Sequence, residues 1–530
     1  MGRRSIASGV SPFDGGGVPM STRRRIGTIS AMNHPEQPSS NAFTGGGSEF
    51  PTALKQVLAV AIPMMISTGM FSLTLFVDRT FLLWYDGTSM GASLAAGNLY
   101  WVAICIPVGI ASMTGAIVSQ YAGAGRDAEI GRFMWQSVWM TIAALPAMAL
   151  IAFYADDLFR WSGQDEALWD AETQYLRLLL IGSAGSIIET ALSGFFSGLH
   201  RTRTIVWVST LSMLVNLGLD VPMIFGTPAW PDPIRFLPGG NWEGMGIAGA
   251  GIASVISFYF KAGCYAMILL GRGSIARRYQ TRNIAFDFAM FRKLMYFGVP
   301  TGLMYVTESG AFTLIVLQIG RLGDLPLRAS TMALNFNMVA FIPLVGVSIA
   351  ASVVIGQTLA RNDQEDPPGP SPENEPFPTA STPRLSPQSV GRAALLIAGV
   401  YALGWALVYA LMPNHLLGLY RITPDDDPTN YLIATSTTLL GYVAAYIIGD
   451  ALQLTMAGVL RGAGDTWFVW AAGLTASVLA LAVGWGFGPP VDDPDGLWFW
   501  WGIIMLWIWL LTGLMTIRYF SGRWLRFRMV

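Results

Sequence analysis

The chain has 530 residues, of which 53% are hydrophobic and only 12% are charged. A soluble protein carries roughly twice that share of charged residues, so the composition excludes an ordinary water-soluble enzyme. The formal net charge is −1, and Lys and Arg form no stripe of the kind that binds nucleic acid. The apolar residues fall in blocks of about 20 or more, long enough to cross a ~30 Å hydrocarbon core as helices.

Residues 1–50 are rich in Gly, Ser, Pro and Arg and contain no apolar run of signal-peptide length. This pattern predicts a disordered cytoplasmic tail rather than a cleaved targeting segment. Further along, Cys105 and Cys264 lie in separate apolar blocks, so they predict neither a disulfide framework nor a metal site.

Twelve apolar blocks follow, and they predict an all-α polytopic membrane protein with twelve transmembrane helices. The first six run over 54–84, 93–118, 133–154, 175–196, 204–225 and 246–270. The second six run over 294–317, 331–355, 393–412, 432–454, 467–487 and 497–517.

The two sets of six blocks repeat each other in sequence. Three pairs share an offset of 237 residues: Pro63 with Pro300, Gly109 with Gly346, and Gln120 with Gln357. Later pairs, such as Gly198 with Gly458 and Arg201 with Arg461, share an offset of 260. The difference marks a 23-residue insertion, which the Pro-rich segment 362–389 supplies. Since each repeat holds an even number of spans, both enter the membrane from the same side and predict two pseudo-symmetric six-helix lobes.

These boundaries divide the chain into a tail, two lobes and three connecting or terminal segments. After the tail 1–50 come an N-terminal lobe 51–275, a cytoplasmic linker 276–292, a C-terminal lobe 293–520 with the disordered cytoplasmic insertion 362–389, and a basic cytoplasmic tail 521–530. Lys and Arg gather in the terminal segments and in alternate loops, so the positive-inside rule predicts that both termini are cytoplasmic.

Ionisable residues inside the apolar blocks are the candidate functional residues, because a charge at the bilayer centre costs about 2.5–3.5 kcal/mol. In the first half these are Asp78 and Asp220, and Asn216 lies four residues before Asp220 on one helix face. Carboxylate and amide oxygens suit a proton relay or a hard cation such as Na⁺. A helix-end role for Asp78, and helix packing alone for the Asn–Asp pair, are the structural alternatives.

In the second half, acidic and aromatic residues share helix faces. Asp450 shares a face with Tyr446 and Gln453, and Glu308 shares one with Tyr305. An acid beside aromatic rings suits a lipophilic cation, through charge pairing and the ring faces. Structural pairing alone would also explain the pattern.

Two further intramembrane charges, Glu189 and Lys261, remain of uncertain role. They could pair with each other or with one of the other acids, and a buried ion pair needs no part in transport. Elsewhere no nucleophile–base constellation or phosphate loop is visible, so the sequence predicts no enzyme and no cofactor.

Several motifs in one order resemble the multidrug and toxic compound extrusion (MATE) transporter family over residues 54 to about 520. The stretches are 76–81 around an acidic residue, 109–126 at the end of the second helix, 216–226 and 246–254. By that likeness, Asp78, Asn216, Asp220 and the hydroxyl of Ser254 would form a cation site in the N-terminal lobe.

The same resemblance implies that Glu308 and Asp450 match the acidic pair of the NorM-like branch in the C-terminal lobe, joined by Tyr446. Asp220 is more typical of the DinF-like branch, so the chain mixes features of both. Arg79, Glu189, Lys261 and the Pro-rich insertion depart from the family pattern, which leaves the coupling ion open.

The resulting hypothesis is a monomeric antiporter in the bacterial inner membrane. The two lobes would rock about a central cavity and exchange H⁺ or Na⁺ for amphipathic, cationic organic compounds. The alternative transporter hypothesis is a flippase for a lipid-linked saccharide, which a strongly cationic central cavity would favour.

Overall fold

The computed structural model describes residues 49–162, 168–226, 243–364, 384–418, 427–490, 493 and 495–530. Predicted tail residues 1–48 and the middle of the predicted insertion, 365–383, therefore lie outside the described residues. The compact unit that contains the helices is Gly46–Val530.

Twelve helices within the described part of the chain are long and apolar enough to span a membrane, which confirms the predicted all-α polytopic fold. They are α1 (Phe50–Tyr85), α2 (Gly87–Gly123), α3 (Asp127–Phe153), α5 (Trp169–Gly198), α6 (Thr202–Phe225), α7 (Ile247–Leu270), α9 (Phe288–Arg321), α10 (Asp324–Asn362), α11 (Pro387–Leu411), α13 (Asp427–Ala463), α14 (Thr466–Phe487) and α15 (Gly496–Phe520). The short elements are α4 (Ala155–Ser162), α8 (Ser274–Arg278), α12 (Pro413–Gly418) and the 3₁₀ helix η5 (Arg523–Arg526).

Local sequence sets several helix ends. Asp287 caps α9 by accepting hydrogen bonds from the backbone N–H groups of Ala289 and Met290 at 2.9 and 3.1 Å. Ser386 caps α11 in the same way, with Pro387 as the first helical residue. The helices α10 and α11 thus take in the first and last residues of the segment predicted as the insertion.

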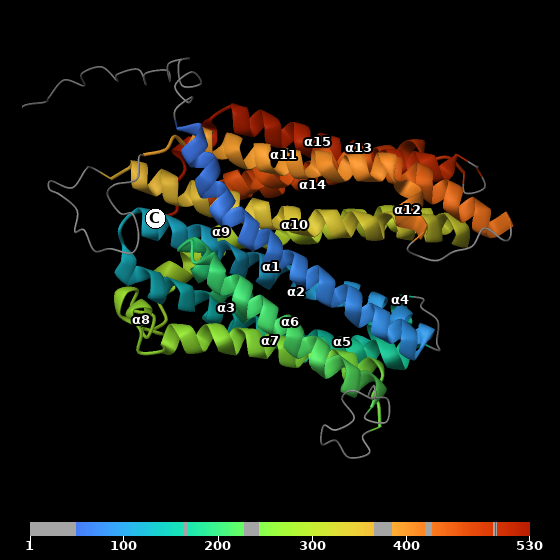
Figure 1. Cartoon of the computed structure of the whole chain (residues 1–530), viewed down its shortest axis with the longest axis horizontal. Helices are drawn as coiled ribbons and strands as arrows, with labels where there is room; N and C mark the ends of the chain where they lie inside the picture. The colour runs from blue at the N-terminus through green and yellow to red at the C-terminus, as the bar shows by residue number, and fades with distance from the viewer. Residues whose placement is uncertain are drawn as a thin grey trace, which may run out of the picture. The chain divides into compact units, whose positions relative to one another are not determined.

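The helices form two groups in Figure 1: α3, α5, α6 and α7 lie together, and α11, α13, α14 and α15 lie together. The remaining long helices, α1, α2, α9 and α10, make the contacts between the two halves, and these contacts follow the sequence repeat. The first helix of each half packs on the second helix of the other half, as α1 on α10 and α9 on α2. A Cβ atom added at Gly109 of α2 would lie 2.3 Å from Gly302 Cα, and one at Gly346 of α10 would lie 2.7 Å from Met65 N. Repeat-related glycines therefore let the backbones of the two halves approach closely at both contacts.

Inside each half, the second and fourth long helices of the repeat also approach closely at glycines. Gly198 on α5 packs against α2, and a Cβ atom added there would lie 2.7 Å from the Gly115 carbonyl oxygen. Its repeat partner Gly458 on α13 packs against α10, and a Cβ atom added there would lie 2.4 Å from the Ser348 carbonyl oxygen. The repeat detected from spacing alone thus corresponds to repeated helix packing.

The segment predicted as a basic tail, 521–530, packs against the helix ends instead of extending away from them. Met529 is 2% exposed, and its backbone N–H donates to Gln120 Oε1 of α2 at 2.7 Å. The same Gln120 donates through Nε2 to the Gly462 carbonyl of α13 at 2.9 Å. Arg528 pairs with Asp363 just beyond α10. This segment therefore connects α2 of the first half to helices of the second half.

Candidate functional site

The N-terminal half holds a buried carboxylate cluster formed by α1, α6 and α7. Asp78 is 4% exposed, and Asn216 and Asp220 are fully buried. With its amide nitrogen turned toward the acids, Asn216 Nδ2 lies 3.0 Å from Asp78 Oδ1 and 3.2 Å from Asp220 Oδ2. Ser254 Oγ donates to Asp78 Oδ2 at 3.4 Å. The four residues predicted for this lobe therefore meet at one place.

The two carboxyl groups of this cluster also contact each other. Two carboxylates in contact repel unless a proton or a cation lies between them. Asp220 Oδ1 is buried and has no hydrogen-bond partner among the described residues. The burial of Asp78 argues against the alternative that it only marks the end of a helix at the membrane surface.

The C-terminal half holds a second cluster, between α9 and α13. Gln453 hydrogen-bonds to Asp450, while Glu308 and Tyr446 lie within electrostatic range of the Asp450 carboxylate. Asp450, Tyr446 and Gln453 are all buried, whereas Glu308 and Tyr305 of α9 are half-buried. The half-buried acid and phenol on α9 are thus the more accessible members of the predicted set.

Glu308 and Tyr305 face α2 of the other half. The Trp101 and Tyr305 ring centroids are 6.2 Å apart, and Trp101 Nε1 donates to Ser309 Oγ at 3.1 Å. An acid, a phenol and an indole therefore lie together where the halves meet, although the sequence interpretation did not include Trp101. Trp101 carries no charge and no motif that would have distinguished it from packing residues.

Arg461 is the other residue that the sequence interpretation missed. It follows the apolar block predicted over 432–454, yet it lies inside α13 with 7% of its surface exposed. Its guanidinium donates to Ser348 Oγ at 2.8 Å and to the Tyr305 hydroxyl at 3.3 Å, and it lies within electrostatic range of Glu308. Spacing could have found it, because position 461 follows Asp450 by eleven residues, or about three helical turns.

Glu189 of α5 and Lys261 of α7 pair with each other, with Oε2 and Nζ 2.9 Å apart. Their side chains are 17% and 18% exposed, so the pair is more accessible than the Asp78–Asp220 cluster. Of the partners left open by the sequence, the structure contains the Glu189–Lys261 combination.

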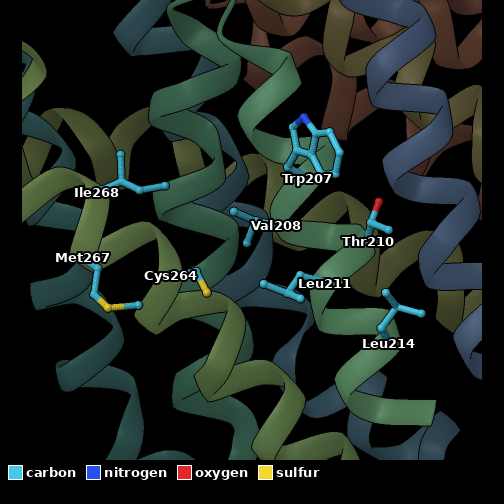
Figure 2. A pocket seen from close by; sticks show the side chains of 8 residues that line it. All are labelled: Trp207, Val208, Thr210, Leu211, Leu214, Cys264, Met267 and Ile268. Atoms are coloured by element: carbon cyan, nitrogen blue, oxygen red, sulfur yellow. The ribbon is translucent and has the colours of Figure 1, made fainter. Parts of the chain in front are cut away.

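A separate apolar pocket of about 370 Å³ lies between α6 and α7. Figure 2 shows Trp207, Leu211 and Leu214 on one wall, with Cys264 and Met267 on the other. Trp207 and Met267 are highly exposed on the surface of the helices, and no ionisable carboxylate or amine lines the pocket. Its apolar lining and its place on the surface of the helices suit an apolar chain such as that of a lipid, and it is distinct from both carboxylate clusters.

The MatE family model matches residues 63–221 and 300–367, which fall in the two halves of the repeat. Relatives align over almost the whole chain. A Xanthomonas axonopodis pv. citri protein called "Probable multidrug resistance protein NorM" is 25% identical and aligns over 90% of this chain and 94% of its own length. The chain belongs to the MATE family.

Another relative, "Multidrug resistance protein PmpM" of Pseudomonas aeruginosa, is 27% identical over 91% of this chain and 92% of its own length. The fold matches the eukaryotic MATE transporter AtDTX14 with a TM-score of 0.73 and 17% identity, over 90% of this chain and 97% of that one. A Pyrococcus furiosus transporter of the MOP superfamily gives a TM-score of 0.75 at 15% identity, over 90% and 97% of the two chains. This MATE protein therefore shares its fold with solved transporters across nearly its full length.

Proposed function

We propose that this MATE-family protein is a multidrug exporter that exchanges H⁺ or Na⁺ for amphipathic organic cations. The observation that carries the proposal is the contact between Asp78 and Asp220 beside Asn216 in the N-terminal half. Transport proteins keep ionisable residues in the membrane at a cost, usually where an ion or substrate must bind. The names of the relatives, "multidrug resistance protein", support export of drugs.

Ion binding at this cluster provides the coupling step. A proton or Na⁺ relieves the repulsion between the two carboxylates, so the occupied and empty clusters favour different helix arrangements. The cluster joins α1 to α6 and α7, and α1 also packs on α10 of the other half. A change at the cluster can therefore act on a contact between the lobes.

Substrate chemistry follows from the residues where the lobes meet. Glu308 supplies a negative charge, and Tyr305 and Trp101 supply neighbouring aromatic faces. A cation with an apolar body is held by such a set through charge pairing and cation–π attraction. Asp450, which is buried and within electrostatic range of Glu308, supplies further negative charge and hydrogen-bonds to Gln453.

The proposal includes a monomer in the bacterial inner membrane with both termini in the cytoplasm. The distribution of Lys and Arg supports this orientation. The bacterial relatives support the inner membrane. No specific observation favours the flippase alternative, which needs a strongly cationic cavity: among the described residues, the charged side chains around Tyr305 are the acids Glu308 and Asp450 and one cation, Arg461.

The test is efflux of ethidium from proteoliposomes under imposed H⁺ or Na⁺ gradients. Asp220→Asn, Glu308→Gln and Asp450→Asn are compared with wild type and with Asp324→Asn, which removes an exposed carboxylate paired with Arg328. The three intramembrane variants are expected to lose gradient-driven efflux while the control keeps it. Wild-type efflux that responds to neither gradient would refute the antiport proposal, and unchanged efflux in the intramembrane variants would refute the site.

A further inference from the structure

One face of α7 carries four polar residues that repeat at helical spacing. Ser254, Ser257, Lys261 and Tyr265 follow one another at intervals of three, four and four residues. Residues at such intervals lie one above another on a helix. Lys261 therefore lies on the same face as Ser254, about 10 Å along the axis from it.

The neighbouring helix α6 presents a face with the same spacing, in Ser209, Ser212, Asn216 and Asp220, and all four residues are buried. The two faces meet through hydroxyl groups. Ser212 Oγ and Ser257 Oγ are 2.8 Å apart, one to two turns from the Asp78–Asp220 cluster. Farther along α6, Ser209 Oγ lies 2.7 Å from Ser67 Oγ of α1.

The track ends at the Glu189–Lys261 pair, which is partly accessible. Two phenols lie within electrostatic range of Glu189, namely Tyr100 from α2 and Tyr265 from α7. Both hydroxyls are buried, with Tyr100 beside Ser186 and Tyr265 beside Ser209. Tyr259 of α7, near Tyr100, donates to the Ile181 carbonyl at 2.8 Å.

With both termini in the cytoplasm, Asp78 lies near the outer end of α1, and Lys261 lies nearer the cytoplasmic end of α7. We propose that the Ser212–Ser257 hydroxyls relay each proton from the Asp78–Asp220 cluster to Glu189 and Lys261, which form a release station for protons on the cytoplasmic side. This inference rests on the proposed antiport function and names its coupling ion. The partly exposed pair, the hydroxyl contact and the buried acids form a continuous order from accessible to inaccessible.

The relay moves one proton and changes only O–H and N–H bonds. Ser254, which donates to Asp78, begins the path. At each hydroxyl, the oxygen receives a proton and the group releases its own to the next acceptor. Glu189 accepts the proton last, which neutralises the carboxylate and weakens its pairing with Lys261, and then releases it to water. Gaps of one helical turn between stations, about 5.4 Å, are spanned by a bridging water.

The Lys261 ammonium decides between the two candidate ions. A sodium ion that moved along this face would pass the ammonium with its positive charge intact, and like charges repel at close range. A proton taken up by Glu189 instead becomes part of the pair. The track therefore favours H⁺ over Na⁺.

The test uses the full chain in proteoliposomes and two sets of substitutions that leave no unpaired buried group. Glu189→Gln with Lys261→Met neutralises the station, and Ser212→Ala with Ser257→Ala removes the linking hydroxyls. Replacing both partners of a buried pair is often nearly neutral for stability. Thr210→Ala is the matched control, because its hydroxyl donates to the Val206 carbonyl of its own helix and to Met70 Sδ of α1, neither of which belongs to the relay.

Three quantities are measured: ethidium affinity by fluorescence, ethidium efflux driven by a proton gradient, and the slowing of that efflux in D₂O. We expect unchanged affinity, a loss of proton-driven efflux of about tenfold, equivalent to about 1.4 kcal/mol of activation free energy, and no remaining D₂O effect in both double variants. The Thr210→Ala control should match wild type in all three.

Other results separate the failure of this inference from that of the proposed function. Wild-type efflux that responds to no gradient refutes the antiport function itself. Efflux driven by Na⁺ alone, or proton-driven efflux that both double variants retain, overturns the relay while leaving antiport intact. Loss of ethidium affinity in the Glu189→Gln/Lys261→Met variant would assign the pair to the substrate cavity and also overturn the relay.

Discussion

The contact between α10 and α13 depends on glycine at position 462. A Cβ atom added to Gly462 would lie 2.2 Å from the Ser352 carbonyl oxygen and 2.8 Å from two further backbone atoms of that residue. Backbone cannot rotate away as a side-chain tip can, so Gly462→Ala must push the two helices apart. We therefore predict that this substitution destabilises the C-terminal half.

The magnitude follows from comparison with Gly441 on the same helix. Overpacking a close contact costs about 1–3 kcal/mol. Gly441 has no heavy atom within 4 Å of its added Cβ, so Gly441→Ala is expected to stabilise the helix by about 0.5–1 kcal/mol. The two alanine variants should therefore differ by roughly 1.5–4 kcal/mol in unfolding free energy, with opposite signs relative to wild type.

The assay is thermal unfolding of the purified protein in one detergent, followed by intrinsic tryptophan fluorescence. Gly462→Ala should lower the midpoint temperature, and Gly441→Ala should leave it unchanged or raise it. Equal midpoints for the two variants would refute the close approach of α10 and α13 at this position.

Three other predictions concern residues near the lobe contacts. Arg461→Lys should lower the free energy of unfolding by about 1–3 kcal/mol, because one ammonium cannot reproduce the planar guanidinium that reaches both Ser348 and Tyr305. A thermal unfolding midpoint equal to that of wild type would contradict this. Met529→Ala should speed amide hydrogen exchange in residues 522–530 and leave α5 unchanged, since Met529 is the buried anchor of that segment; unchanged exchange would show that the segment is held elsewhere. Arg528 holds the pKa of Asp363 below its usual value, so their attraction is present at neutral pH and is lost as pH falls through that lowered pKa. A fluorescent probe on Arg523→Cys, with the native cysteines replaced, should therefore gain mobility in strong acid, and Asp363→Asn should show that mobility already at neutral pH; a variant as rigid as wild type would contradict the tie.

Helical periodicity in the sequence predicted part of the N-terminal carboxylate cluster. Asn216 and Asp220 could be placed on one helix face from their spacing, and the family resemblance brought Asp78 and Ser254 to the same place. Direct contact between the two carboxyl groups could not be predicted, because it depends on how far α1 and α6 approach and how they rotate. Spacing along one helix contains no information about either quantity.

Pairing between helices was the main limit of the sequence reasoning. Glu189 and Lys261 had several candidate partners, and only the packing of α5 on α7 brings them together. Arg461 lies beyond the predicted apolar block, which ends at 454, whereas α13 continues to Ala463. Helices extend beyond their apolar blocks wherever neighbouring helices satisfy the polar residues at their ends.

Ion movement that accompanies substrate movement tests the antiport proposal most directly. Proteoliposomes containing the full chain hold a pH-sensitive dye, or in parallel a Na⁺-sensitive dye, with ethidium inside and no imposed ion gradient. As ethidium leaves down its own gradient, protons or Na⁺ should enter, and Asp220→Asn should abolish this entry. Ethidium efflux in wild type with neither ion entering would contradict antiport.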